Sequence, residues 1–528
     1  MVEVMLGLAC GRWFRGVACC AALVGCGPSA AAPTSGGEAS SESGSTLGED
    51  STGVADSSGG EQPTVDFPPR LLWLRNLPEG GRGLGFVELG DGSDLETHDL
   101  HPELAPTAVV EGFEVLSGTE FVALRARASA DAPAALWLAR AQVGAEGTAA
   151  TIALDGEVTD LAWASVAGVL VVVTTQTSYR IDVGPTSHGE PVELVGSTPS
   201  IELGTIHAAG THVAGEFGPL GARTCHVASL VTNTWTAAYD DEVDRCAVVG
   251  FTGDAVVLRI GDDGTYDLVG RALGPDGLQS PVTLAAGIDL GVLTADGGAV
   301  YRAASPTNDL FWVAFAGGEA GVPEPLSASG TVIPQVSADG RHLAFVDQGV
   351  TKVVGFSSGS PEVVAVPLPS PLIGNSAKFA VSRTGDQIYT LGIRTGAEYW
   401  EDRTSLWRHV LAQGGIDAGV QITETSPTSS EVNPSSIDSI AVAPDGTAVA
   451  YVRNDGLSDY GRDVALTEFG DGAPTEVALA NDAPTSRMAF SSDGAWLIVG
   501  DGQLYRRSGE RVLGGGAVDW RWWESDAP

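Results

Sequence analysis

The sequence has little positive charge. Only two of its 528 residues are lysine, and Lys and Arg together number 28 against 67 Asp and Glu, for a net charge of −39. Proteins that bind nucleic acid need a basic surface to neutralise phosphates, so this composition excludes nucleic acid as a partner. It also disfavours electrostatic docking on anionic lipid and favours a cationic partner or divalent ions.

Several catalytic and binding signatures are missing as well. The sequence contains no P-loop, no dinucleotide fingerprint, no HExxH motif and no CxxC pair. From Phe67 onward no long segment has the apolar periodicity of a helix. These absences exclude the enzyme and metal-site classes that such motifs define, and they point away from a helical fold.

The N-terminal segment carries a targeting pattern. Arg12 and Arg15 precede a short apolar run at 16–23, which is shorter than the about 20 apolar residues of a membrane-spanning helix. Small residues then lead to a cysteine in Leu23-Val24-Gly25-Cys26. A charged start, a short apolar core and small residues before a cleavage point are typical of a secretory signal.

The stretch at 23–26 resembles the lipobox of bacterial lipoproteins. The resemblance implies that residues 1–25 are a signal peptide, and that Cys26 becomes the lipidated first residue of a protein anchored in the cell envelope. Gly27 stands where an Asp often favours inner-membrane retention in that family, so the outer membrane is favoured, with the periplasmic face and the cell surface both open. The alternatives are an ordinary signal peptide and a cytosolic start with a coincidental cysteine.

A polar segment follows the predicted lipidation site. Residues 27–66 contain no Lys, Arg or aromatic residue and consist largely of Ser, Gly, Thr, Ala, Glu and Asp. Such a segment cannot bury enough apolar surface to offset its ordering entropy. We therefore expect residues 26–66 to form a disordered acidic tether that reaches on the order of 35 Å from the membrane.

Two cysteines remain after the predicted cleavage, besides the lipidated one. Cys225 and Cys246 would lie in an oxidising compartment, where a disulfide between them is expected. Two buried free thiols are the alternative.

Short strand-like segments repeat along the rest of the chain. The clearest copies, at 333–345, 440–451 and 488–499, each consist of an apolar strand, an Asp-Gly turn and a second strand. Looser copies extend the series, with turn glycines spaced mostly 42 to 50 residues apart, at Gly118, Gly168, Gly210, Gly253, Gly297, Gly340, Gly385, Gly446 and Gly494. A period near 43 to 45 residues is typical of a β-propeller blade of four strands.

The repeat at 337–345 resembles that of TolB-type, WD40-like propellers, and the stretches at 443–451 and 491–498 are similar to it. The resemblance implies an all-β fold over residues 67–528, a β-propeller of seven to ten four-stranded blades. The segment at 517–522 is predicted to pair with strands at 71–74, 84–87 and 95–98 in one blade. The fold itself says little about activity, because many unrelated functions use this scaffold.

Other motifs favour ordinary turns over chemistry. Gly355-Phe356-Ser357-Ser358-Gly359 matches a nucleophile elbow, but a turn and a strand follow it instead of the helix that an elbow requires. The stretch His98-Asp99-Leu100-His101 could supply metal ligands, but no third ligand for zinc is evident. A solvated acidic loop is expected there, and a divalent-ion site with Asp91, Asp94 and Glu96 is the alternative. We predict no metal and no cofactor; calcium bound in the turns at 262–267 or 454–459 is the alternative.

The longest interval between turn glycines, from Gly385 to Gly446, contains an insertion at 395–436. We predict a partner-binding loop there, with Tyr399, Trp400 and Trp407 as its contact residues. The alternative is a long hairpin whose rings pack on their own blade. The tryptophans at the C-terminal end are predicted to lie in the core, at Trp520, Trp522 and Trp523.

These features predict a non-enzymatic envelope lipoprotein. Its propeller would bind an envelope protein, a peptide or a glycan, and its lipid would hold it to the membrane. Two alternatives stay open. One is a propeller enzyme, a lyase or hydrolase of polysaccharide or peptide whose site several blades would assemble. The other is a structural component of an outer-membrane complex.

Overall fold

The structure, a computed structural model, describes residues 70–523 with gaps at 78, 90–94, 96, 101–106, 143–144, 197–205, 210, 219–222, 240–242, 250–254, 263–264, 275–276, 295–297, 304–308, 317, 328–333, 338–340, 357–360, 371, 399–400, 413–414, 427–434, 455–461, 470–473, 481–486 and 516. The predicted signal peptide, Cys26 and the predicted tether lie outside the described residues.

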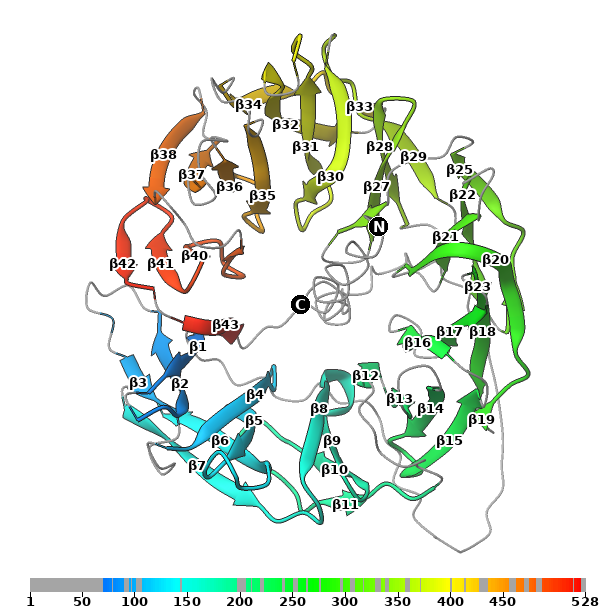
Figure 1. Ribbon diagram of the computed structural model, residues 1–528, viewed down its shortest axis with the longest axis vertical. Helices are drawn as coiled ribbons and strands as arrows, with labels where there is room; N and C mark the ends of the chain where they lie inside the picture. The colour runs from blue at the N-terminus through cyan, green and yellow to red at the C-terminus, as the bar shows by residue number, and fades with distance from the viewer. Residues whose placement is uncertain are drawn as a thin grey trace, which may run out of the picture.

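The described chain is almost entirely β. Helical structure in it is limited to 3-10 turns, such as Ser165–Ala167, and no helix of the described residues is long and apolar enough to cross a membrane. The strands form successive sheets of mostly four strands, antiparallel except for one parallel contact at Arg82 and Val109 in the first sheet. Figure 1 shows these sheets following one another in chain order around the molecule. The all-β propeller fold predicted from the repeats is thus the fold of the chain.

The first half of the chain forms four groups of strands, the first two joined in one eight-stranded sheet. The groups are β1 (Arg70–Asn76), β2 (Arg82–Glu88) and β3 (Thr97–Asp99); β4 (Val109–Val115), β5 (Phe121–Arg127), β6 (Ala135–Gln142) and β7 (Ala145–Ile152); β8 (Val158–Ala164), β9 (Val169–Thr174), β10 (Ser178–Asp182) and β11 (Val192–Glu193); β12 (Ile206–Ala209), β13 (His212–Phe217), β14 (Thr224–Ser229) and β15 (Thr234–Tyr239).

A second eight-stranded sheet and a small hairpin follow. The sheet contains β16 (Val243–Val249), β17 (Ala255–Asp262), β18 (Thr265–Gly274), β19 (Gly277–Leu278), β20 (Val282–Leu293), β21 (Ala299–Ala303), β22 (Leu310–Val313) and β25 (Glu324–Ser327); the hairpin is β23 (Phe315–Ala316) and β24 (Glu319–Ala320). The long strand β20 pairs with β18 near its start and with β21 near its end, so it links two four-stranded groups.

The last sheets repeat the four-strand pattern, one of them with an extra short strand. They are β26 (Gln335–Val336), β27 (His342–Asp347), β28 (Val350–Gly355) and β29 (Glu362–Ala365); β30 (Ile373–Val381), β31 (Gln387–Arg394), β32 (Arg403–Ala412), β33 (Gly415–Ile416) and β34 (Val420–Glu424); β35 (Ser436–Val442), β36 (Ala448–Asn454), β37 (Arg462–Glu468) and β38 (Thr475–Ala480); β39 (Met488–Phe490), β40 (Trp496–Val499), β41 (Gln503–Arg506) and β42 (Arg511–Leu513).

The final strand, β43 (Ala517–Trp523), returns to the start of the chain. It pairs antiparallel with β1, so Trp520 lies opposite Trp73 and Trp522 opposite Leu71. Figure 1 shows β43 beside β1. The pairing predicted between the two ends of the domain is present in this sheet. The two merged sheets can be counted as one unit or two, so the number of blades within the range of seven to ten stays a prediction.

The core lies between neighbouring sheets. All six residues of β9 are buried, because both faces of this β-branched strand are covered. One cluster combines Leu136 of β6 with Val172 of β9, and another combines Leu310 of β22 with Val354 of β28. Each sheet therefore buries its apolar faces against the sheets on either side, and such stacking is what a propeller requires.

The predicted turn glycines have the backbone conformation that the repeat requires. Positive φ angles of 79°, 62°, 76°, 68° and 68° occur at Gly118, Gly168, Gly385, Gly446 and Gly494. A side chain disfavours this left-handed region, so glycine is the natural residue at the turn. The other four predicted turn glycines, Gly210, Gly253, Gly297 and Gly340, lie outside the described residues.

Candidate functional site

Equivalent hairpin turns join the first and second strands of three consecutive sheets. In each turn the first residue donates its backbone N–H to the carbonyl five positions later: Ser382 to Gln387 at 2.9 Å, Ala443 to Ala448 at 2.9 Å, and Ser491 to Trp496 at 3.0 Å. Because the turns share this bond and a left-handed glycine, their residues can be compared position by position. Asp445 and Asp493 are equivalent in this comparison.

A second equivalent position lies at the end of the third strand. There the backbone N–H bonds to the turn of the same sheet, at Val183, Phe356, Leu411, Phe469 and Arg507. Val183 and Phe356 are buried against the preceding sheet, in clusters with Leu116 and Leu310. Four of the five residues are apolar, as the contact between sheets favours. Arg507 places a charge where the others place an apolar side chain.

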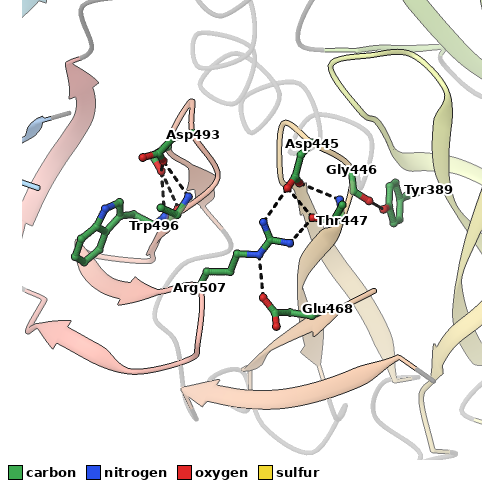
Figure 2. A network of polar contacts seen from close by, with 10 residues as sticks. Tyr389, Asp445, Gly446, Thr447, Glu468, Asp493, Trp496 and Arg507 are labelled. Carbon is green, nitrogen blue, oxygen red and sulfur yellow. Dashed lines mark hydrogen bonds and ion pairs between the residues drawn. The ribbon is translucent and has the colours of Figure 1, made fainter. Parts of the chain in front are cut away.

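The Arg507 guanidinium is bound by the preceding sheet. Its Nη1 donates to Asp445 Oδ2 at 2.9 Å, its Nε donates to Glu468 Oε1 at 2.8 Å, and its Nη2 donates to the Thr447 hydroxyl. Figure 2 shows the side chain crossing from its own loop to this cluster. We call these four residues the Arg507 network. It connects the β39–β42 sheet to the β35–β38 sheet through charged hydrogen bonds, which are stronger than neutral ones.

The turn that carries Asp445 is fixed from both sides. Asp445 Oδ1 accepts the Thr447 backbone N–H at 2.9 Å, and the Tyr389 hydroxyl of β31 donates to the Gly446 carbonyl at 2.9 Å. Burial raises the pKa of Tyr389, so this phenol keeps its proton and acts as a donor. Burial opposes ionisation of Asp445, but the hydrogen bonds from Thr447 and Arg507 outweigh it and lower the pKa of Asp445.

A hollow lies at the equivalent place on the next sheet. It measures about 470 Å³ and is lined by Leu89, Asp493, Gly494, Ala495, Trp496, Arg506, Arg507 and Ser508. Leu89 directly follows β2, which is the third strand of its group when β43, paired with β1, is counted as the first, and thus corresponds to Arg507. We call this cavity the Asp493 hollow. It occupies the place that the Arg507 side chain occupies in the neighbouring pair of sheets.

The polar groups of the Asp493 hollow are partly satisfied. Asp493 Oδ1 accepts hydrogen bonds from the Ala495 backbone at 2.9 Å and from the Ser491 hydroxyl at 2.5 Å. Arg506 lies with its guanidinium carbon 5.0 Å from the centre of the Trp496 ring, and its Nε is 3.3 Å from Glu510. The Asp493 carboxylate is exposed, while the Trp496 ring beneath Arg506 is buried.

A second hollow, of about 370 Å³, lies between the β4–β7 and β8–β11 groups. It is lined by Phe121, Leu138, Arg140, Thr148, Ala149, Ala150, Thr186, Ser187 and His188. Arg140 is already paired with Glu120, and the His188 ring packs edge-on against Phe121 with centroids 5.9 Å apart. It has no counterpart of Asp493, because Gly118 stands at that position of the turn.

A partly buried ion pair joins β43 to β4. Arg521 Nη1 donates to Glu114 Oε2 at 3.0 Å, and the Arg521 guanidinium lies 4.9 Å from the centre of the Phe113 ring. Burial raises the pKa of Glu114, although the Arg521 charge opposes the shift. This pair connects two strand groups, as the Arg507 network does, and its carboxylate is already occupied by an arginine.

The predicted contact loop is only partly described. Trp407 lies on strand β32, is 8% exposed, and donates its indole N–H to the Ser405 hydroxyl at 2.9 Å. It therefore offers little surface to a partner. Tyr399 and Trp400 lie outside the described residues, so the binding role of this loop stays a prediction.

The predicted cysteine pair lies on neighbouring strands. Cys225 of β14 is fully buried and disulfide-bonded, and β14 contacts β16, the strand that contains Cys246. The Cys246 side chain lies outside the described residues, so its identity as the bonding partner stays a prediction.

The remaining motifs have these surroundings. Gly355 ends β28 and the next strand is β29, so the chain continues as sheet after the GxSxG stretch. Asp99 pairs with Arg75, and His98 packs on Phe86. Among the described residues, no three His, Cys, Asp or Glu side chains are grouped closely enough to hold a metal ion. His101 and parts of the two turns considered for calcium, at 263–264 and 455–459, lie outside them.

The Asp493 hollow and the Arg507 network were not identified from the sequence. A signal for them existed: when the repeats are aligned at the end of the third strand, Arg507 is the one charged residue among four apolar ones. Trp520, in contrast, lies in the core as predicted, 4% exposed, with its indole N–H donated to the Gly500 carbonyl at 2.9 Å.

No protein-family model matches the sequence, and no curated protein matches it. Among solved structures, the chain is similar to a eukaryotic initiation factor, at 12% identity and a TM-score of 0.44, over 83% of this chain and 98% of that one. It is also similar to the tricorn protease, at 10% identity and a TM-score of 0.32, over 86% of this chain and 48% of that one. Hsv2 of Kluyveromyces lactis is similar at 14% identity and a TM-score of 0.32, over 61% of this chain and 97% of that one. Likenesses of this degree carry no argument about function.

Proposed function

We propose that this protein is a lipid-anchored binding scaffold of the bacterial cell envelope. Cys26 carries the lipid, residues 27–66 hold the propeller away from the membrane, and the loops of the propeller bind a protein, peptide or glycan. The outer membrane is the favoured location. The observation that carries the binding role is the Asp493 hollow, an open cavity at a hairpin turn that its own hydrogen bonds hold in place.

Rigid turns around an open cavity suit a binding surface. A partner that docks on preformed loops loses less conformational entropy than one that must first order them. The Asp445 turn is held by Arg507 and Tyr389, and the Asp493 turn by its own backbone and side-chain hydrogen bonds. Loops on such a scaffold commonly carry recognition.

Site-specific photocrosslinking in the native envelope tests the binding role. A photoreactive amino acid replaces Ser508, which is exposed at the Asp493 hollow, and a matched variant carries it at the exposed residue Ser129 in the loop between β5 and β6. We expect a discrete crosslinked species from position 508 that position 129 does not give. Identical crosslinks from both positions, or none from 508, contradict the proposed binding face.

Fractionation tests the anchoring. Cys26→Ser removes the acceptor of the lipid, and Cys20→Ser changes a cysteine within the predicted signal peptide as the matched control. We expect the Cys26→Ser protein to leave the membrane fraction and the Cys20→Ser protein to stay in it. A Cys26→Ser protein that remains fully membrane-bound contradicts lipid anchoring.

A further inference from the structure

We infer that the Asp493 hollow binds an arginine or lysine side chain of a partner protein, in the way that the chain binds its own Arg507. This inference rests on the proposed binding function and names the chemistry of the partner. It follows from comparing two equivalent places on consecutive sheets, one filled by a side chain of this protein and the other open.

The filled place shows how a cation is held. Asp445 uses Oδ1 to accept the backbone N–H two residues on, and uses Oδ2 to bind the Arg507 guanidinium at 2.9 Å. In the open place Asp493 uses Oδ1 in the same way, to accept the Ala495 N–H at 2.9 Å. Within the described part of the chain, Asp493 Oδ2 accepts no hydrogen bond. The oxygen that corresponds to the arginine acceptor thus belongs to a residue that lines the cavity.

Leu89 explains why the second place is open. It stands where Arg507 stands in the other pair of sheets, and it is buried in the cluster that contains Trp496. Its side chain ends in that core and carries no charge. The hollow of about 470 Å³ that remains is large enough for one long basic side chain from outside.

Two differences set the strength of binding. Ala495 occupies the position equivalent to Thr447, so the hollow lacks one hydroxyl acceptor. Arg506 occupies the position equivalent to Glu468, so the hollow has a cation where the Arg507 network has a carboxylate. Arg506 is partly compensated by Glu510 and by the Trp496 ring. We therefore expect weaker binding of an external cation than of Arg507, and we expect replacement of Arg506 by an acid to strengthen it.

The overall charge favours the same class of partner. A net charge of −39 attracts basic segments and repels acidic ones over several ångströms in solution. Arg506 and Arg507 both line the hollow, but Arg507 is already bound by Asp445 and Glu468. An acidic ligand that paired with Arg506 would meet Asp493 and this field. The Asp493 carboxylate and the charge of the whole chain thus favour a basic segment as the occupant.

The test measures binding of a short peptide to the full chain in low-salt buffer by calorimetry. The probe is an acetylated and amidated Gly-Arg-Gly-Arg-Gly peptide, and its twin has Glu in place of Arg. The variants are D493N, which keeps the oxygen that accepts the Ala495 N–H, R506E, and D131N, which changes an exposed carboxylate elsewhere. Thermal melting of each variant shows that it is folded.

We expect the arginine peptide to bind, D493N to weaken it about fivefold, R506E to tighten it by about the same factor, and D131N to leave it unchanged. Equal weakening by D493N and D131N would show non-specific attraction and overturn the inference. Binding of the glutamate peptide that R506E abolishes would also overturn it and leave an anion site. If a partner is crosslinked at position 508 but the arginine peptide does not bind, this inference fails and the proposed binding function stands. If no partner is crosslinked and the arginine peptide does not bind, the proposed binding function fails as well.

Discussion

Arg507 and Asp445 are 62 residues apart in the sequence, and an ion pair of 2.9 Å between Nη1 and Oδ2 joins them across two sheets. Burial opposes the charge on Arg507, but its hydrogen bonds to Asp445 and Glu468 outweigh this and raise its pKa further. Figure 2 shows that the guanidinium reaches the turn of the preceding sheet. Salt screens charges, so the stability of a contact between two sheets that depends on an ion pair falls as the salt concentration rises, whereas that of an apolar contact does not.

The first prediction concerns this contact. Arg507→Met keeps an apolar stem and removes the charge, leaving Asp445 and Glu468 without their cation. All three side chains are partly exposed, so solvent screening limits the loss to about 1 kcal/mol of unfolding free energy. Denaturant unfolding at low salt measures the loss, and at about 1 M salt we expect the difference from the unaltered protein to shrink.

Arg394→Met is the matched control for Arg507→Met. Arg394 is half-exposed, and its Nε lies 3.7 Å from Glu424, too far for a hydrogen bond. We expect no measurable change in stability from this variant. An equal loss from both variants, or a loss from Arg507→Met that salt does not reduce, would contradict the role given to Arg507.

The second prediction compares two turn glycines. Gly446 and Gly494 have the same φ of 68°, so alanine at either costs about 1 kcal/mol for a left-handed backbone. A Cβ at Gly494 meets its nearest neighbour at 3.5 Å, whereas a Cβ at Gly446 would lie 2.7 Å from the Gln387 amide. Gln387 is buried, its Oε1 accepts a hydrogen bond from Arg408 at 2.9 Å, and the Tyr389 hydroxyl lies 3.1 Å from the same oxygen, so it cannot easily move.

We therefore expect Gly446→Ala to lower the free energy of unfolding by about 2 kcal/mol and Gly494→Ala by about 1 kcal/mol. Denaturant unfolding of the two variants side by side gives the comparison. Since both have the same backbone angle, the difference between them reports the contact with Gln387. Equal losses would mean that Gln387 moves aside freely.

Much of the fold could be predicted from sequence because glycine and β-branched residues act locally. The positive φ at Gly446 and the buried run of β9 each follow from a few neighbouring residues. The pairing of β43 with β1 also followed, because unpaired strands at both ends of a repeat series complement each other. The number of blades did not follow, since β20 serves two strand groups and blurs their boundary.

The candidate site could not be predicted in the same way. Asp445 and Arg507 are ordinary turn and loop residues in the sequence, and only the packing of one sheet on the next brings them together. Trp407 shows what sequence could not supply about the predicted contact loop. Its place on β32 buries the ring and pairs its indole N–H with Ser405, which position in an insertion does not reveal.

The third prediction concerns the cysteines. If Cys225 bonds to Cys246, the bridge closes a loop of about 20 residues and stabilises the domain by roughly 3 kcal/mol. We expect the mature protein to resist alkylation until it is reduced, and a reductant to lower its melting temperature. Cys246→Ser should abolish the effect of the reductant and leave Cys225 open to alkylation after unfolding. Resistance of Cys225 to alkylation in that variant would contradict the pairing.

The fourth prediction concerns acid stability. His409 of β32 is fully buried, and burial lowers its pKa from the ordinary 6.5, although Asp417, 3.8 Å away, opposes the shift. Above pH 6.5 the ring is neutral in both the folded and the unfolded chain. As the pH falls below this value the unfolded chain takes up a proton that the folded chain resists, so stability declines.

Denaturant unfolding of the unaltered protein and of His409→Asn at about pH 7.5 and about pH 5.5 measures the contribution of this histidine, because other groups such as Glu114, whose pKa is raised by burial, contribute to both proteins. The carboxylates with lowered pKa, Asp386 and Asp445, ordinarily titrate near 3.8, so their contribution is lost only at lower pH. We expect His409→Asn to reduce the difference in stability between the two pH values, whatever its effect at each one. His188→Asn, at an exposed histidine, should leave that difference unchanged. A buried neutral ring that resists protonation must contribute to the loss of stability in acid. If His409→Asn shows the same difference in stability between the two pH values as the unaltered protein, the acid sensitivity originates elsewhere.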